Sequence, residues 1–210
     1  ETLTSLAVTE WKLARPDDAE AHLRQAFLKD PKRLDSALAL VKMKLDRKDV
    51  AGAEEVMRQM VAQQPNSPGA LVAMGEFYYA LGRAADGEAQ IRRAHQVDPN
   101  HGPALLDLAA IEVRAGNLAA AEALYRRLSS LPGPEYRHYH ALFLLETGKT
   151  EDGVAELRAL SAKYPDDRRV RSALVTGLVM ARRLPDATAV LTAALKKNSK
   201  DVDALLQRGS

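Results

Sequence analysis

The sequence predicts an all-α protein built from repeated helical hairpins. Pro31, Pro65 and Pro99 are each 34 residues apart, and Pro165 lies close to two further periods along the chain. Aromatic residues make up only 5% of the 210 residues, while alanine and leucine are abundant, a composition that favours helices over a β-rich core. A period of this length is typical of an α-solenoid, in which each repeat packs only against its neighbours.

The proline-containing turns divide the chain into six full repeats and the start of a seventh, which we expect to form one continuous solenoid over residues 1–210. Places within a repeat are counted from the residue after each such turn. The predicted repeats are 1–33, 34–67, 68–101, 102–133, 134–167 and 168–201, with a partial repeat at 202–210.

Two places in each repeat carry small or short side chains, twelve residues apart. This spacing predicts two antiparallel helices that cross too closely for larger side chains. The eighth place holds Ala7, Val41, Gly75, Ala109, Ala141, Val175 and Gly209, and the twentieth holds Ala19, Ala53, Gly87, Ala121, Gly153 and Ala187.

Two other places carry large side chains, which are expected to fill the spaces between the helices. The seventh place holds Leu6, Leu40, Met74, Leu108 and Leu174, and the twenty-fourth holds Leu23, Met57, Ile91, Tyr125, Leu157 and Leu191.

Each hairpin is predicted to turn near its fifteenth place. Gly82, Gly116 and Gly148 stand there in three repeats, and glycine is the usual residue after the last turn of a helix. Asp49 and Asn117 are expected to cap the second helices that follow. Ser67-Pro68 is typical of an N-cap followed by proline in the first helical turn.

The pattern resembles the tetratricopeptide repeat family over essentially the whole chain. Its best copy carries Leu71, Met74, Gly75, Tyr78, Gly87, Ile91, Ala94 and Pro99 at the family's signature places. The resemblance implies a right-handed superhelix whose first helices, about fourteen residues long, line an inner groove that binds an extended peptide or a partner helix.

The resemblance also implies which places face the groove: the second, fifth, sixth, ninth, twelfth and thirteenth. The alternative for each residue is that it packs against the next repeat instead, and the same alternative applies to Trp11 in the first repeat. The predicted partner-binding residues are Val72, Glu76, Tyr79, Leu106, Asp107, Ala110, Val113, Arg114, His138, Tyr139 and Leu142.

The fifth repeat departs from the pattern. Arg137 and His140 occupy places that are normally apolar, and the preceding repeat is two residues short at 131–134. The register over 131–140 is therefore open, and Tyr136 and Tyr139 are alternative core residues. We expect a local change of superhelical pitch there.

Composition and motifs exclude several classes of function. The net charge of +2 gives no global attraction to nucleic acid. No cysteine is present, and His138 and His140, two apart on a predicted helix, point in directions too different to chelate one ion. We therefore predict no metal, no cofactor, no catalytic residue and no enzyme activity. No apolar stretch approaches the roughly twenty residues of a membrane-spanning helix, so direct membrane insertion is not expected.

Residues 163–200 carry nine Lys and Arg against three Asp. We interpret this cluster as a solvated surface, with an anionic partner as the alternative.

The predicted function is that of a scaffold for protein or peptide partners. One alternative is the regulatory or targeting region of a larger enzyme, such as a kinase, methyltransferase or glycosyltransferase. Another is a component of bacterial exopolysaccharide secretion or surface-protein sorting, whose repeats these resemble. Because the chain begins at Glu1, we expect it to be part of something longer, and the choice between cytoplasm and periplasm stays open. Leu205 and Leu206 open an incomplete repeat and make end-to-end self-association possible.

Overall fold

The computed structural model describes residues 3–13, 15–30 and 33–209, and within these ranges it contains helices and turns but no strand. Pro31, the first residue of the proline period, lies outside the described residues. The chain divides into two compact units, Glu1–Ala104 (unit 1) and Leu105–Ser210 (unit 2), and each is described by itself. The all-α prediction is confirmed, whereas the repeat boundaries and a single solenoid over 1–210 stay predictions.

The helices of unit 1 alternate along the chain, with short turns between them. They are α1 (Leu3–Lys12), α2 (Pro16–Lys29), α3 (Leu34–Asp46), α4 (Val50–Gln63), α5 (Pro68–Ala80) and α6 (Ala84–Val97). α7 (Gly102–Arg114) begins at the end of unit 1 and continues into unit 2. The remaining helices of unit 2 are α8 (Leu118–Ser129), α9 (Tyr139–Glu146), α10 (Thr150–Lys163), α11 (Arg168–Met180), α12 (Leu184–Lys197) and α13 (Val202–Gly209).

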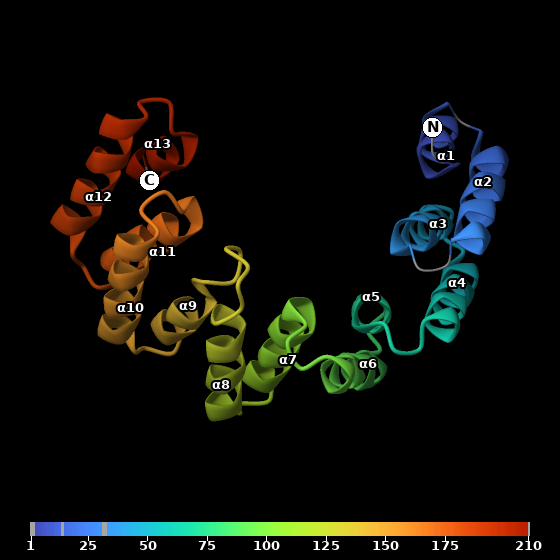
Figure 1. Ribbon diagram of the computed structural model, residues 1–210, viewed down its shortest axis with the longest axis horizontal. Coiled ribbons are helices and arrows are strands. Elements are labelled where there is room, and N and C mark those ends of the chain that lie inside the picture. Colours follow the sequence, from blue (N-terminus) through green and yellow to red (C-terminus); the bar gives the residue numbers. More distant parts are fainter. Residues whose placement is uncertain (1–2, 14, 31–32, 210) are drawn as a thin grey trace. The chain divides into compact units, whose positions relative to one another are not determined.

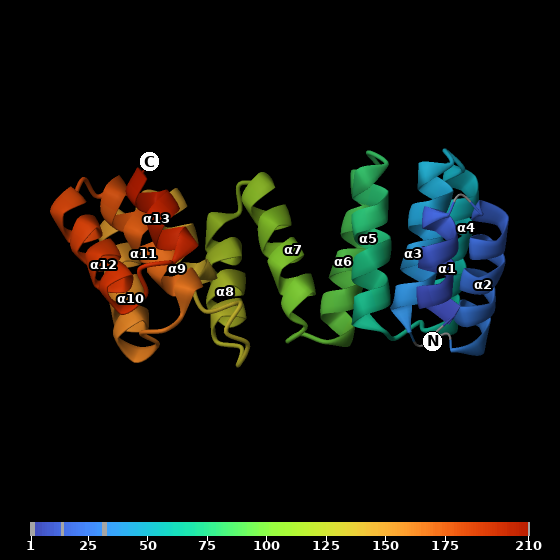
Figure 2. The ribbon, with the colours of Figure 1, turned by 90° about the horizontal axis from the view of Figure 1, so that it is seen from above.

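Consecutive helices pack as antiparallel hairpins, α1 on α2, α3 on α4, α5 on α6, α9 on α10 and α11 on α12. In unit 1, the first helices α1, α3 and α5 follow one another on one side and α2, α4 and α6 lie on the other (Figure 1). In unit 2, α9, α11 and α13 lie on one side and α10 and α12 on the other. We call the side formed by the first helices the first-helix face of its unit. Figure 2 shows the helices of unit 1 standing side by side.

The hairpin crossings confirm the two columns of small residues. A Cβ atom added to Gly75 on α5 would lie 3.0 Å from the carbonyl oxygen of Gly87 and 2.7 Å from Cδ1 of Ile91. A Cβ atom added to Gly153 on α10 would lie 2.9 Å from the carbonyl oxygen of Ala141 on α9. The two backbones therefore approach too closely for a larger side chain. The alanines at the same places, Ala7, Ala19, Ala53, Ala109 and Ala121, are fully buried.

The hairpin turns confirm the predicted break near the fifteenth place. Gly82, Gly116 and Gly148 have φ values of 74°, 77° and 84°, the left-handed region that favours glycine. Lys48 and Arg182 adopt the same conformation, with φ values of 61° and 57°, in the hairpins that have no glycine there.

Two of the three predicted helix caps are confirmed. The Asp49 carboxylate accepts a hydrogen bond from the Gly52 amide at 2.8 Å, and the Ser67 hydroxyl accepts one from the Ala70 amide at 3.3 Å. The third prediction was wrong. Asn117 makes no side-chain cap, and its side-chain amide donates to the Glu112 carboxylate at 2.8 Å instead.

The fifth repeat differs from the prediction in the length of its first helix. The sequence predicted about fourteen residues, but α9 has only eight, and residues 134–138 form a turn before it. Because the turn takes up residues that are helical in the other repeats, His138 precedes the helix rather than lying on it. Tyr136 and Tyr139 are half-buried, and the Tyr139 ring stacks on Tyr125 of α8 with ring centres 6.5 Å apart.

The polar residues of the fifth repeat are accommodated by an ion pair and a hydrogen bond. Arg137 contacts the Asp167 carboxylate at 3.0 Å, and its guanidinium lies 3.8 Å from the centre of the Tyr164 ring. His140 is buried, and its Nδ1 lies 2.7 Å from the Glu156 carboxylate. Buried charged groups are tolerated when each has such a partner.

Glutamates at one place in the repeat link three of the second helices to the following repeat, while the fourth, Glu88, pairs with Arg92 on its own helix at 2.8 Å. The twenty-first place is Glu20, Glu54, Glu88 and Glu122 in the first four repeats. Glu20 contacts Lys44 at 2.7 Å, Glu54 contacts Arg83 at 2.9 Å, and Glu122 contacts Lys149 at 2.6 Å. The cations hold the pKa of all three carboxyl groups below their usual range, chiefly by hydrogen bonding to the ionised form. Sequence analysis missed this row, although glutamate recurs directly after the small residue at the twentieth place.

Candidate functional site

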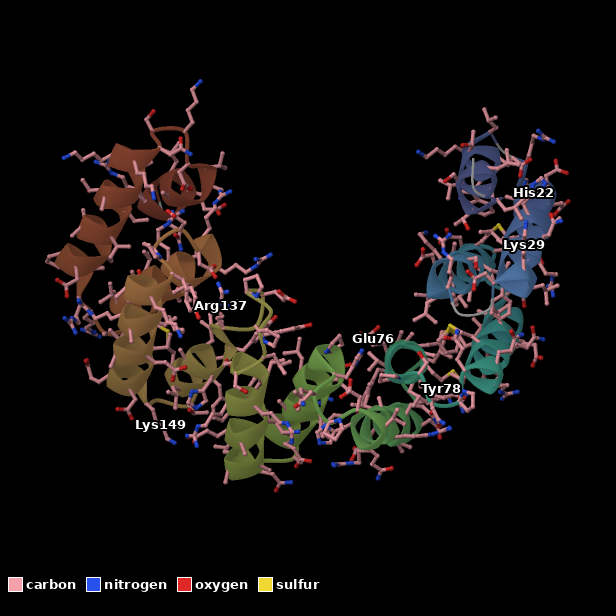
Figure 3. All side chains as sticks on the ribbon, in the orientation of Figure 1. His22, Lys29, Glu76, Tyr78, Arg137 and Lys149 are labelled. Carbon is pink, nitrogen blue, oxygen red and sulfur yellow. The ribbon has the colours of Figure 1, made fainter. Side chains whose placement is uncertain are left out.

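The three predicted binding residues of unit 1 lie on α5 in different environments. Val72 is buried and contributes to the core, whereas Glu76 is exposed. Figure 3 labels Glu76 on the first-helix side of α5, while Tyr78 lies toward α4, where its hydroxyl donates to Glu54. The Tyr79 ring lies against Gly87, within 2.8 Å of where a Cβ would stand, so part of it packs inside its own hairpin.

An apolar notch lies on the first-helix face between α1 and α3. It measures about 180 Å³, and Trp11, Val8 and Met43 are among its lining residues. Lys42, which pairs with Asp46 at 2.7 Å, lies at the same notch. Trp11 also packs against the core of unit 1. It therefore both lines the notch and packs against neighbouring residues, which are the two alternatives that the sequence left open.

The five predicted residues of α7 are graded in exposure along the helix. Leu106, Asp107 and Ala110 are half-buried, whereas Val113 and Arg114 near the end of the helix are exposed. Of the five residues, Val113 and Arg114 are therefore the most accessible to a partner.

The three predicted residues of the fifth repeat are divided by the short α9. His138 and Leu142 line an open pocket of about 480 Å³, together with residues of α11 and α13. Tyr139, between them in sequence, stacks on Tyr125 and on His138. The pocket lining is His138, Leu142, Arg168, Arg169, Ser172, Ala173, Thr176 and Asp203.

Most cations around this pocket are matched by a carboxylate. Arg137 pairs with Asp167 at 3.0 Å, Arg168 with Asp203 at 2.8 Å, and Arg171 with the buried Asp201 at 2.7 Å. Among the described residues, Arg169 has no such partner. Of the nine cations at 163–200, four pair with carboxylates: Arg168, Arg171, Arg183 and Lys197. Arg169 is the cation among the pocket-lining residues for which the described part of the chain offers no carboxylate.

His138 lies at the edge of the same pocket. Burial lowers the pKa of its imidazole, the nearby Asp167 carboxylate opposes this, and the Arg169 charge lowers it further. The His138 Nδ1 is buried and finds no hydrogen-bond partner among the residues that the structure describes.

Exposed large apolar side chains recur at the predicted groove places. Their exposed fractions run from 37% for Leu45 to 68% for Leu206. Unit 1 presents Val8, Leu38 and Leu45 in this way, and unit 2 presents Val113, Val179, Met180 and Leu206. Eight other exposed large apolar side chains in the described part of the chain stand at other places, among them Leu28, Val97 and Leu184 on second helices. Apolar side chains on an exposed face are typical of protein–protein contact surfaces.

Two other kinds of feature are absent from the described part of the chain, a metal site and a membrane-spanning helix. No group of three or more His, Asp or Glu side chains there is placed to hold a metal ion. His138 and His140, which the sequence analysis judged unable to chelate one ion, have separate surroundings, the pocket for the first and Glu156 for the second. No described helix has the length and apolar character needed to cross a membrane.

Sequence analysis named the central repeats and left out the sixth. Arg169, Ser172, Ala173 and Thr176 stand at the second, fifth, sixth and ninth places of that repeat, which are groove places. Counting the groove places in the sixth repeat, as was done for the central repeats, would have identified these four residues.

Comparison with known proteins gives matches along most of the chain. A family model described as tetratricopeptide repeat matches residues 4–68 and 72–133, which is more than half of the chain, and a second model with that description matches residues 44–94. The cellulose synthase operon protein C of Xanthomonas axonopodis pv. citri (strain 306) is 28% identical over 169 residues. That match covers 76% of this chain but only 11% of the relative, so the chain spans about a ninth of that protein's length.

Solved structures share the fold. A tetratricopeptide repeat protein from Parabacteroides merdae ATCC 43184 matches 99% of this chain and 83% of its own, with a TM-score of 0.65 and 16% identity. PilW, a type IV pilus biogenesis factor, matches 99% of this chain and 97% of its own, with a TM-score of 0.60 and 22% identity. At these identities the likeness concerns the fold alone.

Proposed function

Because this chain belongs to the tetratricopeptide repeat family, we propose that it is a scaffold that binds an extended peptide or a helix of a partner protein on its first-helix faces. Members of this family generally serve as scaffolds for protein–protein interaction. The observation that carries the proposal is the set of exposed apolar side chains at groove places, among them Val8, Leu38, Val179 and Met180. A partner that covers them removes apolar surface from water, at roughly 25 cal/mol per Å² buried.

Residues around these side chains supply polarity. Glu76 and Arg114 are exposed on their helices, and charged groups at the edge of an apolar contact fix the orientation of a partner more than they add affinity. Trp11 and Tyr79 are the aromatic anchors of the proposed surface in unit 1, since aromatic side chains carry much of the energy of typical interfaces.

Site-specific photo-cross-linking tests this function. A photoreactive amino acid placed at Val179 or Leu38, both on first-helix faces, should yield adducts with partner proteins in the native lysate. The same group at Arg158 on α10, outside the first-helix face, should yield few. Equal labelling from all three positions would contradict the proposal. Capture should also weaken when Tyr79 and Arg114 are both replaced by alanine.

A second candidate function is a role in bacterial exopolysaccharide secretion. It is favoured by the 28% identity to the cellulose synthase operon protein C, and it is compatible with the first, since a scaffold could act within such a system. Deleting the gene and measuring cell-surface cellulose by dye binding tests it. Loss of the polysaccharide, restored by the full-length gene, is the expected result, and unchanged polysaccharide would exclude the role.

A further inference from the structure

The pocket between α9, α11 and α13 has a charge that no described residue balances. The neighbouring cations form separate pairs, Arg137 with Asp167, Arg168 with Asp203 and Arg171 with Asp201. Asp203, the only acidic side chain among the pocket-lining residues, is thereby engaged. Arg169, the residue after Arg168 on α11, is exposed and lines the pocket, and no carboxylate of the described residues pairs with its positive charge.

His138, which lines the same pocket as Arg169, carries a polar atom without a partner among the described residues. His138 Nδ1 is buried and makes no hydrogen bond to any described residue. A buried polar atom without a hydrogen bond is unfavourable, so a ligand group that reaches it and forms that hydrogen bond gains affinity. When Nδ1 carries the ring proton it can donate to an anionic oxygen.

The remaining lining residues offer polar and apolar contacts to the other atoms of an acidic residue in an extended segment. The Ser172 and Thr176 hydroxyls stand one turn apart on α11, and Thr176 donates to the Ser172 carbonyl oxygen at 3.1 Å. Leu142 and Ala173 supply apolar contact for methylene groups. Val179 and Met180, exposed further along α11, would meet apolar residues beside the acidic one.

We propose that this pocket binds the carboxylate of an aspartate or glutamate side chain in an extended segment of a partner protein, with Arg169 as its counter-ion and His138 as a hydrogen-bond donor. The proposal rests on the proposed function, since it names the chemistry of the partner at one point of the same face. An arginine–carboxylate contact suits this task because the guanidinium offers paired donors in a fixed plane.

Two short peptides provide the probe, acetyl-Leu-Glu-Leu-amide and its isosteric relative acetyl-Leu-Gln-Leu-amide. Each is titrated into the full 210-residue chain while the His138 ring signal is followed by NMR, with that signal assigned from its absence in His138→Gln. The glutamate peptide should bind about tenfold more tightly than the glutamine peptide, the difference expected for one charge-assisted hydrogen bond. It should also raise the pKa read from the His138 signal, because a nearby anion favours the imidazolium form.

Arg169→Gln should abolish the preference for glutamate. Arg182→Gln is the matched control, since it removes the same charge from an exposed arginine in the α11–α12 turn, and it should keep the preference. Equal binding of the two peptides, or equal effects of the two arginine variants, would overturn the proposal, as would a His138 response to inorganic phosphate but not to the glutamate peptide. The cross-linking test from Val179 decides the proposed function separately. If the peptide test fails but cross-links still form from Val179, only the carboxylate pocket is refuted. If those cross-links are also lost, the proposed function is refuted as well.

Discussion

The third and fifth repeats solve the same packing problem with different residues. In the third, α5 and α6 cross at Gly75 and Gly87, and the residues around the crossing are apolar, including the fully buried Ile91. In the fifth, α9 and α10 cross at Ala141 and Gly153, but Arg137 and His140 stand where apolar residues are usual. The crossing itself is preserved, while α9 shortens to eight residues, and the Arg137–Asp167 ion pair and the His140–Glu156 hydrogen bond accommodate the polar side chains. Helix crossing and helix length are therefore set by separate features of the sequence.

The largest expected loss of stability comes from placing a larger side chain at the helix crossing of either repeat. Gly75→Leu and Gly153→Leu should each lower the free energy of unfolding by about 3 kcal/mol, because the backbone opposite must move away. Urea unfolding followed by circular dichroism measures this. Gly209→Ala is the control, since a Cβ there meets open space. A large loss for one glycine and none for the other would show that the two crossings are not equivalent.

The second effect is specific to the fifth repeat. Asp167 pairs with Arg137 and also caps α11, accepting hydrogen bonds from the amides of Arg169 and Val170 at 3.1 and 3.3 Å. Asp167→Ala should cost about 2 kcal/mol in the free energy of unfolding, through loss of the cap and of the ion pair.

Asp167→Asn separates the two contributions. Asparagine caps helices as well as aspartate does, so this variant should lose only the ion pair and show roughly half of the effect. If the asparagine variant is as unstable as the alanine variant, the ion pair rather than the cap dominates.

The third prediction compares the glutamates that link the second helices to the next repeat, Glu54 beside the third repeat and Glu122 beside the fifth. The pKa of each carboxyl group is lowered in the folded protein. Their stabilisation is therefore fully present above the unfolded-state pKa, about 4.5, and is lost as the pH falls through the lower folded-state pKa.

Melting temperatures measured between pH 7 and pH 3 test this dependence. Glu54→Gln and Glu122→Gln should each show a shallower decline toward acid than the unmodified chain. Glu151→Gln, at a mostly exposed carboxylate 3.7 Å from Arg183, serves as control and should follow the unmodified curve.

The fourth prediction restores the usual residue in the fifth repeat. His140→Leu places leucine where Leu40, Leu108 and Leu174 stand in other repeats. Because Glu156 is 31% exposed and can be hydrated, the free energy of unfolding should change by less than about 1 kcal/mol. His140→Ala should cost more, because it leaves a cavity. A severe loss of stability for His140→Leu would mean that the hydrogen bond with Glu156 is indispensable.

The smallest effect concerns the hairpin turns. The third and fifth repeats use Gly82 and Gly148 at positive φ, whereas Lys48 and Arg182 hold the same conformation without glycine. Lys48→Gly and Arg182→Gly should stabilise the chain by about 0.5–1 kcal/mol, because an L-residue pays a steric cost in the left-handed region. Thermal melts should show a small rise, and a fall would mean that the lysine or arginine side chain contributes contacts of its own.

The regular repeats could be predicted from sequence because their determinants are local and periodic. Gly75 and Gly87 lie twelve residues apart within one hairpin, and the turn glycine falls between them. The fifth repeat could not, because the partners of Arg137 and His140 are Asp167 and Glu156, 30 and 16 residues away, and no period marks them. The same reasoning explains the pocket around Arg169. Its position was predictable from the numbering, but its unmatched charge depends on which neighbouring arginines find carboxylates.

The glutamate row on the second helices has a mechanical consequence. Within each unit, one side of a repeat junction is joined by charges such as Glu54–Arg83 and Glu122–Lys149, and the buried side by apolar contacts. Salt screens the exposed charges, with a Debye length near 8 Å at physiological ionic strength, but leaves apolar burial in place. We therefore expect rising ionic strength to weaken the charged side of each such junction and to leave its apolar side unchanged, with a limited effect because Glu54 and Glu122 are only 16% and 21% exposed.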